Sequence, residues 1–143
     1  FMKAMARVVD EAKSSGMAAC VFYIDLDGFK SVNDQVGHHA GDRVLVEVAE
    51  ALRACVRSTD VVGRLGGDEF AIVARGMSDR RDAEALAEKI AVAVRAIEIH
   101  RAGLQLGASI GICMLPNAAV SAPQDAIDAA DQAMLSVKKL KPF

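Results

Sequence analysis

Two acidic residues directly after an apolar run are the first candidates for chemistry in this chain. Asp25 and Asp27 follow the run 20–24, whose β-forming residues indicate a central strand buried on both faces. Residues two apart in a strand share a face, so both carboxylates are expected to point at one site at the strand's end. Clustered like charges repel unless a cation or water relieves them. The alternative, a solvated loop acid that caps the next helix, stays open for both residues.

A second acidic pair, Asp68 and Glu69, follows the paired glycines 66–67. Short β-type runs at 61–62 and 70–73 make this a hairpin signal, because paired glycines take the positive φ angles of tight turns. Alone, the pair is a weak signal, and a polar turn is the simpler interpretation. Beside the end of a neighbouring strand, the two pairs can face each other. Carboxylates from two segments suit Mg²⁺, a hard cation that also binds substrate phosphates.

Between the acidic pairs lie two residues suited to a guanine base. The carboxylate of Asp42 can accept from the adjacent N1–H and N2–H₂ donors of guanine, and the amide of Asn33 can pair with its acceptors. The plainer interpretation makes Asn33 a turn residue and Asp42 the N-cap of a helix over 43–56. His38 and His39 are adjacent and therefore poorly placed to bind one metal ion together, so we expect them at the surface or at a helix end.

Hydrophobic periodicity predicts the elements that must position these residues. The expected order is a helix ending at 14–16, a strand over 20–24, a helix over 43–56, a hairpin of 61–62 and 70–73, a helix over 79–98, a strand over 104–113 and a helix over 123–137. A hairpin inside a helix-rich alternation indicates an α/β (α+β) fold with a mixed or mainly antiparallel sheet and helices packed on it, rather than a doubly wound parallel sheet.

Length and composition exclude several classes of protein. The chain has 143 residues, 52% of them hydrophobic and 25% charged, which is typical of one globular domain and not of a disordered tail or a fibre. Lysine and arginine number 17 against 19 acidic residues, a balance that argues against a nucleic-acid partner. No apolar run approaches the ~20 residues that cross a bilayer, so no membrane contact by this domain is expected.

The cysteines predict the compartment. Cys20, Cys55 and Cys113 are far apart, odd in number and set among apolar neighbours, so we expect buried, reduced thiols rather than a disulfide framework or a zinc site. Reduced thiols indicate a reducing compartment such as the cytoplasm. Because the sequence starts abruptly at Phe1 and stops at Phe143, we also expect a piece of a longer protein.

The segment from Asp25 to Asp42 (DLDGFKSVNDQVGHHAGD), followed by RLGGDEF at 64–70, resembles the GGDEF domain of diguanylate cyclases. Residues 109–112 and 130–134 are similar to later blocks of that family. The resemblance covers essentially the whole chain and implies a single GGDEF domain over 1–143 of a multidomain signalling protein. It implies a nucleotidyl-cyclase-like (ferredoxin-like) fold with a five-stranded, mainly antiparallel sheet flanked by helices.

The resemblance also implies an activity and its requirements. Two GTP molecules would be joined into cyclic di-GMP with release of two pyrophosphates, with Mg²⁺ or Mn²⁺ assisting attack of a 3′-hydroxyl on an α-phosphate. Each domain would hold one GTP, so two domains of a homodimer must face each other. The domain would work in the cytoplasm, either free or as the cytoplasmic part of a membrane-anchored protein.

Residue roles follow from the resemblance position by position. Asp25, the Leu26 carbonyl and Asp68 would bind metal, and Glu69 would support a second ion. The catalytic residues implied are Asp68, Glu69 and Lys30; the substrate-binding residues implied are Asn33 and Asp42 for guanine, and Gly28, Phe29, Lys30, His38 and Lys138 for the rest of the nucleotide. Arg57 and Asp60 match an inhibitory product site, where an arginine fork and a carboxylate grip phosphate and guanine. Taken without the resemblance, these two residues are a solvated ion pair.

Two departures from the family's pattern leave the activity open. The usual opening segment D-x-L-T-G-L-x-N-R is absent, and the usual Y-x-A-K-x-x-G-R-N reads LSVKKLKPF at 135–143. Leu135 replaces the tyrosine, Lys141 stands at the glycine position and Pro142 at the arginine position. The intact acids favour an active cyclase. The altered tail favours the alternative, a weak or inactive module that binds GTP or cyclic di-GMP and regulates an attached output domain.

Overall fold

The fold is built around one central strand, β1 (Ala19–Asp27), in an antiparallel sheet of order β2-β3-β1-β4. The computed structural model describes residues 1–99, 101 and 103–141. The other elements are α1 (Met2–Ser15), α2 (Phe29–Val36), α3 (His38–Cys55), β2 (Val61–Gly66), β3 (Glu69–Arg75), α4 (Arg80–Arg95), β4 (Gly107–Leu115) and α5 (Pro123–Lys139).

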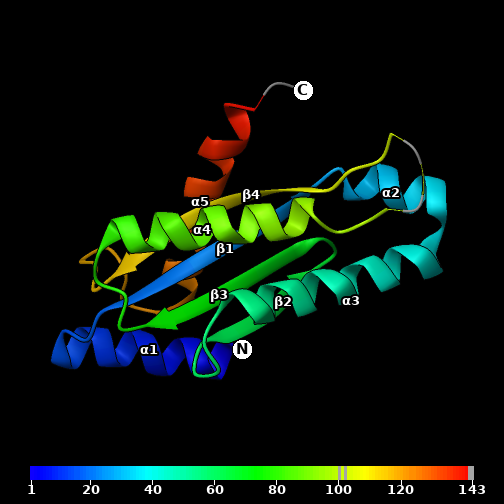
Figure 1. Cartoon of the computed structure of the whole chain (residues 1–143). Coiled ribbons are helices and arrows are strands. Elements are labelled where there is room, and N and C mark those ends of the chain that lie inside the picture. The colour runs from blue at the N-terminus through cyan, green and yellow to red at the C-terminus, as the bar shows by residue number, and fades with distance from the viewer. Residues whose placement is uncertain (100, 102, 142–143) are drawn as a thin grey trace.

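Helices cover both faces of the sheet. In Figure 1, α3 and α4 lie in front of the sheet and α5 lies behind it. Alternate β1 side chains such as Phe22 and Ile24 pack with α3 and α4, whereas Val21 and Tyr23 pack with α1 and α5. A strand buried on both sides needs apolar residues at every position, which explains the continuous apolar run in the sequence.

Strand register gathers the acidic residues at one edge of the sheet. Asp25 pairs with Glu69 of β3 on one side and with Ser109 of β4 on the other. The Leu26 N–H donates to the carbonyl of Asp68 at 3.1 Å, which fastens the β2–β3 turn to the end of β1. We call the end of β1, this turn and the start of β4 the acidic edge, defined by residues 25–27, 66–69 and 107–109.

The predicted fold class is confirmed, with differences in detail. The described residues form four strands instead of five, because the sequence contains only four β-type runs and the fifth strand was implied by the resemblance alone. Asp25 and Asp27 lie within β1 rather than after it. Helix α2 is missing from the expected elements, although Phe29, Val32 and Val36 fall at the i, i+3 and i+7 spacing of a helix.

The prediction of buried thiols holds at two of the three cysteines. Cys20 and Cys113 are buried free thiols, as predicted, but Cys55 is half-buried at the end of α3, so the expectation of three core thiols is wrong at that position.

Among the described helices, none combines the length and apolar character needed to span a bilayer.

Candidate active site

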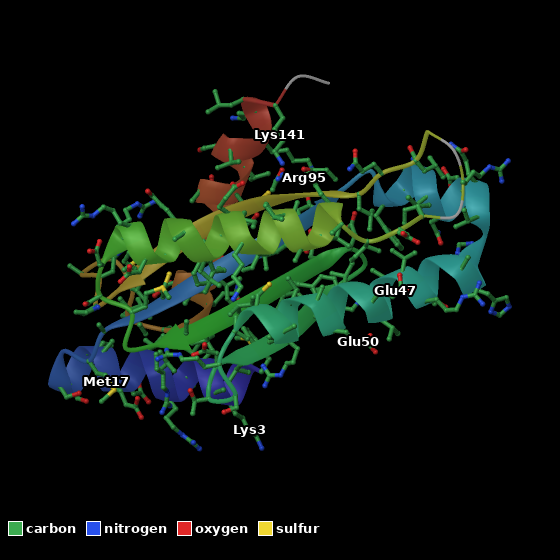
Figure 2. All side chains as sticks on the ribbon, viewed as in Figure 1. Lys3, Met17, Glu47, Glu50, Arg95 and Lys141 are labelled. Atoms are coloured by element: carbon green, nitrogen blue, oxygen red, sulfur yellow. The ribbon has the colours of Figure 1, made fainter. Side chains whose placement is uncertain are left out.

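Two lysines of the α5 end meet the two aspartates of β1. Asp25 and Asp27 both face α5, as their spacing predicted. The Lys138 Nζ donates to Asp25 Oδ2 at 2.6 Å, and the Lys141 Nζ donates to Asp27 Oδ2 at 2.5 Å. Figure 2 labels Lys141 at the end of α5. The hydrogen bond to Asp25, followed by the nearby carboxylate charges, raises the pKa of Lys138, so its ammonium stays charged.

The acids of the β2–β3 turn complete this edge. Burial, followed by the negative charge of Asp25, raises the pKa of Asp68 above its ordinary value. Glu69 lies opposite Asp25 across the strand pair, and its Oε2 accepts from the Tyr23 hydroxyl at 2.7 Å. Burial and that hydrogen bond raise the pKa of Tyr23, so the phenol remains a donor. Four carboxylates therefore lie at the acidic edge. Burial and the charges of Asp25 and Glu69 make ionisation of Asp68 less favourable than usual.

The donor set of the acidic edge fits a hard divalent cation. Asp25 and Asp68 supply carboxylate oxygens close enough for one charge to shift the pKa of the other. In the described residues no group of three or more His, Cys, Asp or Glu side chains encloses a metal position. Mg²⁺ is commonly held by one or two carboxylates with water and substrate phosphates in the remaining positions, so an incomplete protein shell suits it.

The two residues predicted to bind guanine lie on two neighbouring helices. Asn33 belongs to α2 and Asp42 to α3, so both plainer interpretations, a turn residue and an N-cap, are wrong. A Cβ at Gly41 would lie 2.2 Å from Asn33 Oδ1, so the glycine lets the amide sit against α3. The Asn33 Nδ2 lies 3.1 Å from His38 Nδ1. Exposed Asp42 lines a cavity of about 380 Å³ with Arg64 and residues of α3.

The turn between β1 and α2 follows the acidic edge directly in the chain and leads to an exposed cation, Lys30. Gly28 has φ of 84°, a left-handed conformation that favours glycine, and a Cβ there would lie 3.0 Å from the Gln105 carbonyl. Phe29 begins α2, and Lys30 follows with an exposed side chain. The first-turn N–H groups of a helix lack partners within that helix and carry partial positive charge, which suits a phosphate.

Arg57 and Asp60 lie before β2, away from the Gly66–Gly67 end of that strand. Asp60 is 3% exposed, and its carboxylate accepts from the backbone N–H of Arg57 at 3.0 Å and from its guanidinium at 3.3 and 3.4 Å. The guanidinium also contacts the Arg75 carbonyl. Arg57 is 62% exposed, so the pair presents an arginine to solvent and keeps its aspartate inside.

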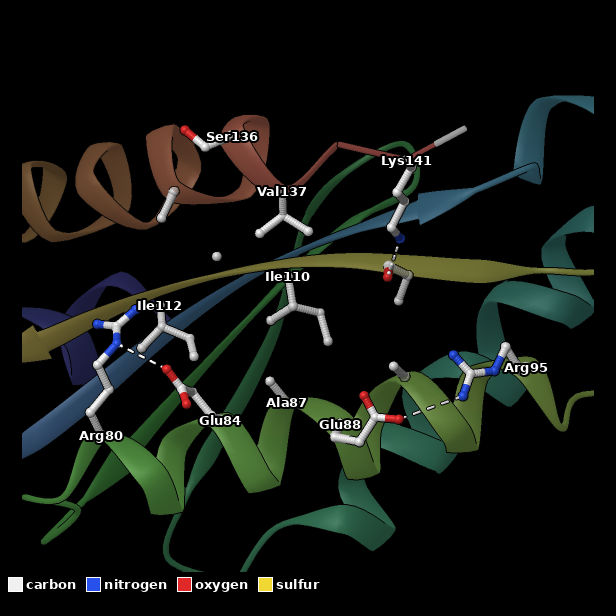
Figure 3. Close-up of a pocket in the computed structure, with 14 residues that line it drawn as sticks. Arg80, Glu84, Ala87, Glu88, Arg95, Ile110, Ile112, Ser136, Val137 and Lys141 are labelled. Carbon is white, nitrogen blue, oxygen red and sulfur yellow. Dashed lines mark hydrogen bonds and ion pairs between the residues drawn. The ribbon is translucent and has the colours of Figure 1, made fainter. Parts of the chain in front are cut away.

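A cavity of about 650 Å³ lies elsewhere, between α4 and α5 over β4. Figure 3 shows Ile110 and Val137 pointing into it and ion pairs at its rim, among them Arg80 with Glu84. Lys141 also lines this cavity, where its Nζ donates to the Ala108 carbonyl at 2.7 Å. The sequence did not predict that Lys141 would reach Asp27, because no local spacing links residues 114 positions apart.

Comparisons with known proteins identify the family of this chain. The sequence matches the family described as diguanylate cyclase, GGDEF domain, over residues 1–141. It is 42% identical over 113 residues to the bifunctional diguanylate cyclase/cyclic di-GMP phosphodiesterase MucR of Pseudomonas aeruginosa, covering 78% of this chain and 16% of MucR. It is 36% identical over 137 residues to the diguanylate cyclase TpbB of the same species, covering 94% of this chain and 31% of TpbB. The chain thus spans less than a third of either relative.

Solved structures give the same result. The GGDEF domain of TpbB superposes with a TM-score of 0.87 at 34% identity, covering 99% of this chain and 88% of that one. The GGDEF domain of DgcB from Caulobacter crescentus, solved in complex with c-di-GMP, superposes with a TM-score of 0.84 at 25% identity, covering 96% and 81%. The chain belongs to the GGDEF domain family.

Proposed function

We propose that this domain is a diguanylate cyclase that condenses two GTP molecules into cyclic di-GMP and two pyrophosphates. The observation that carries the proposal is the acidic edge, where β1 and the β2–β3 turn bring Asp25 and Asp68 together beside Lys138. The similarity to TpbB and MucR, named as diguanylate cyclases, supports the same activity.

The residues divide the work along the nucleotide. Asp42 and Asn33 read the guanine, while the Gly28–Phe29 backbone, Lys30, His38 and Lys138 contact the phosphates and the rest of the nucleotide. Asp25, Asp68 and the Leu26 carbonyl would hold Mg²⁺ or Mn²⁺, with Glu69 supporting a second ion. When bound, the metal neutralises charge on the α-phosphate and lowers the pKa of the attacking 3′-hydroxyl.

Lys138 acts before and after nucleotide binding. In the free domain its ammonium partly neutralises Asp25, which would otherwise face Asp68 unrelieved. A lysine is a point charge on a flexible stem, so it can turn from a carboxylate to a phosphate without a fixed geometry. Because its side chain is 40% exposed, little protein has to move for this exchange.

Catalysis requires two domains. One domain binds one GTP, so each 3′-hydroxyl meets the α-phosphate held by the facing copy. Specific activity is therefore expected to rise with protein concentration. A specific activity that stays flat at concentrations where the protein is demonstrably monomeric would contradict the homodimer.

Arg57 and Asp60 form the proposed inhibitory site for cyclic di-GMP. The exposed guanidinium offers a fork to a phosphate, and its separation from the acidic edge allows inhibition without competition for GTP. The DgcB domain, solved with c-di-GMP, supports the family's ability to hold this product.

We further propose that the domain works in the cytoplasm. We also propose that it is part of a longer signalling protein, in keeping with the greater length of its relatives.

A second candidate is a module that binds GTP or cyclic di-GMP without turnover and regulates an attached domain. The altered tail favours it: Lys141 replaces the family's glycine, and Pro142, which lies outside the described residues, replaces the arginine. Incubation with GTP and Mg²⁺, followed by chromatography and mass spectrometry, decides between the two. Cyclic di-GMP formation supports the cyclase, whereas GTP binding measured by calorimetry without product supports the regulatory module.

A further inference from the structure

Asp27 is the most enclosed carboxylate of the acidic edge, and its partners are specific. Its side chain is 8% exposed at the end of β1. Both of its oxygens accept from the Ser109 hydroxyl, at 3.0 and 2.9 Å, and Oδ2 also accepts from the Lys141 ammonium at 2.5 Å. A hydroxyl alone does not neutralise a buried carboxylate, and an unpaired buried charge is strongly unfavourable. Lys141 therefore supplies the charge that Asp27 needs.

Lys141 also ties the end of α5 to the sheet. It follows the last helical residue, Lys139, by two positions, and its ammonium donates to the Ala108 carbonyl of β4 as well as to Asp27 of β1. One side chain thus connects the helix end to two adjacent strands.

Lys138 lies three residues earlier and has a choice of carboxylates. Its Nζ is 2.6 Å from Asp25 Oδ2 and 4.0 Å from Asp27 Oδ1. Both ammonium groups contact carboxylates of β1, so both lysines approach the strand from the same side. With Lys141 in place, each aspartate has a cation of its own. Without Lys141, Asp27 would be a buried anion with Lys138 as its nearest cation.

We propose that Lys141 is a positioning residue that occupies Asp27 and thereby keeps Lys138 on Asp25, ready to turn to the nucleotide phosphates. The proposal concerns this chain in particular, because a glycine, the residue expected at position 141 from the resemblance, has no side chain to do this. Its nucleotide-binding part rests on the proposed function, whereas the competition of the two lysines for Asp27 does not.

The competition is tested without nucleotide by thermal unfolding of the wild type, Lys141→Met, Lys138→Met and the double variant. Lys141→Met is expected to lower the midpoint by about 5 °C, and Lys141→Arg to recover about half of that loss. The double variant is expected to lose more than the sum of the single losses, because Lys138 becomes the only cation for Asp27 once Lys141 is gone. Strictly additive losses would overturn the proposal.

The positioning role is tested by calorimetry with a non-hydrolysable GTP analogue and Mg²⁺, well below the unfolding midpoints. Lys141→Met is expected to weaken binding about tenfold, because Lys138 is then drawn to Asp27. Adding Asp27→Asn to Lys141→Met removes that pull, and affinity is expected to return to within about threefold of the wild type. The matched control, Lys139→Met, changes an exposed neighbouring lysine and is expected to leave affinity unchanged.

The outcomes separate the two claims. A Lys141→Met protein with wild-type affinity, or one that Asp27→Asn fails to rescue, would overturn the positioning role and leave Lys141 as a structural anchor. A wild type that binds no analogue would refute the proposed function and the nucleotide-binding role together. In that case the unfolding experiment still decides whether the lysines compete for Asp27.

Discussion

Each end of the sheet holds a carboxylate that is paired with a cation, but the two cations come from different distances along the chain. At the acidic edge, Asp25 is paired with Lys138, 113 residues further along the chain. At the other end, Asp60 is paired with Arg57, three residues before it, through the backbone N–H and the guanidinium together. A pair between distant residues depends on the tertiary fold, whereas a pair within one turn needs only local backbone.

The cations differ as well. A lysine ammonium is a compact charge that can exchange one anion for another, and the fold brings Lys138 to Asp25, a carboxylate that the proposed function assigns to metal binding. The Arg57 fork is fixed by Asp60 and the Arg75 carbonyl, yet remains 62% exposed. We infer that the acidic edge is arranged for exchange of partners during a reaction, and that the Arg57 end is arranged for binding by a preformed group.

The largest expected effect is at the acidic edge. Asp25→Asn or Asp68→Asn removes a charge of the proposed metal site and little packing, so turnover is expected to fall at least about 100-fold while the circular dichroism spectrum stays unchanged. Cyclic di-GMP production at saturating Mg²⁺ measures it. Near-normal turnover in either variant would show that the carboxylates do not serve the metal.

An intermediate effect is expected at the other end. Arg57→Ala should weaken cyclic di-GMP binding by about 2–3 kcal/mol, the value of hydrogen bonds to a charged group, because the fork is lost. Initial turnover at low product should hardly change. Calorimetry with the product compares the two proteins, and equal affinity would reduce Arg57 and Asp60 to an ion pair without a ligand.

The smallest effect is on stability and pH. The pKa of Asp68 is raised in the folded protein, so ionisation of this carboxyl destabilises the fold as pH rises above its ordinary value of 3.8. Asp68→Asn should therefore unfold at a slightly higher temperature than the wild type at neutral pH, and this difference should vanish when pH is lowered to about 3. Thermal unfolding across pH 3–8 measures it. An Asp68→Asn protein less stable than the wild type at pH 7 would contradict the unfavourable ionisation of Asp68 that burial and the charge of Asp25 cause.

Sequence reasoning succeeded where one element carried the signal. The apolar run before Asp25 and the glycines before Asp68 identified β1 and the hairpin, and with them the acidic edge. It failed where position depended on packing between distant segments. Nothing local to residues 138–141 indicates that two lysines reach β1. Helix α2 has only eight residues, so its apolar residues at helical spacing cover barely two turns, fewer than a periodic pattern needs to stand out. The interpretation of Asp42 as an N-cap was wrong because α3 begins four residues earlier, at His38.

We infer that the acidic edge, and not the Arg57 end, holds the divalent cation with the nucleotide. Electron paramagnetic resonance of Mn²⁺, titrated into the protein with a non-hydrolysable GTP analogue, tests it directly. The wild type and Arg57→Ala should bind Mn²⁺ equally, whereas Asp25→Asn should bind it at least about tenfold more weakly. Equal Mn²⁺ affinity in Asp25→Asn and the wild type would contradict the account.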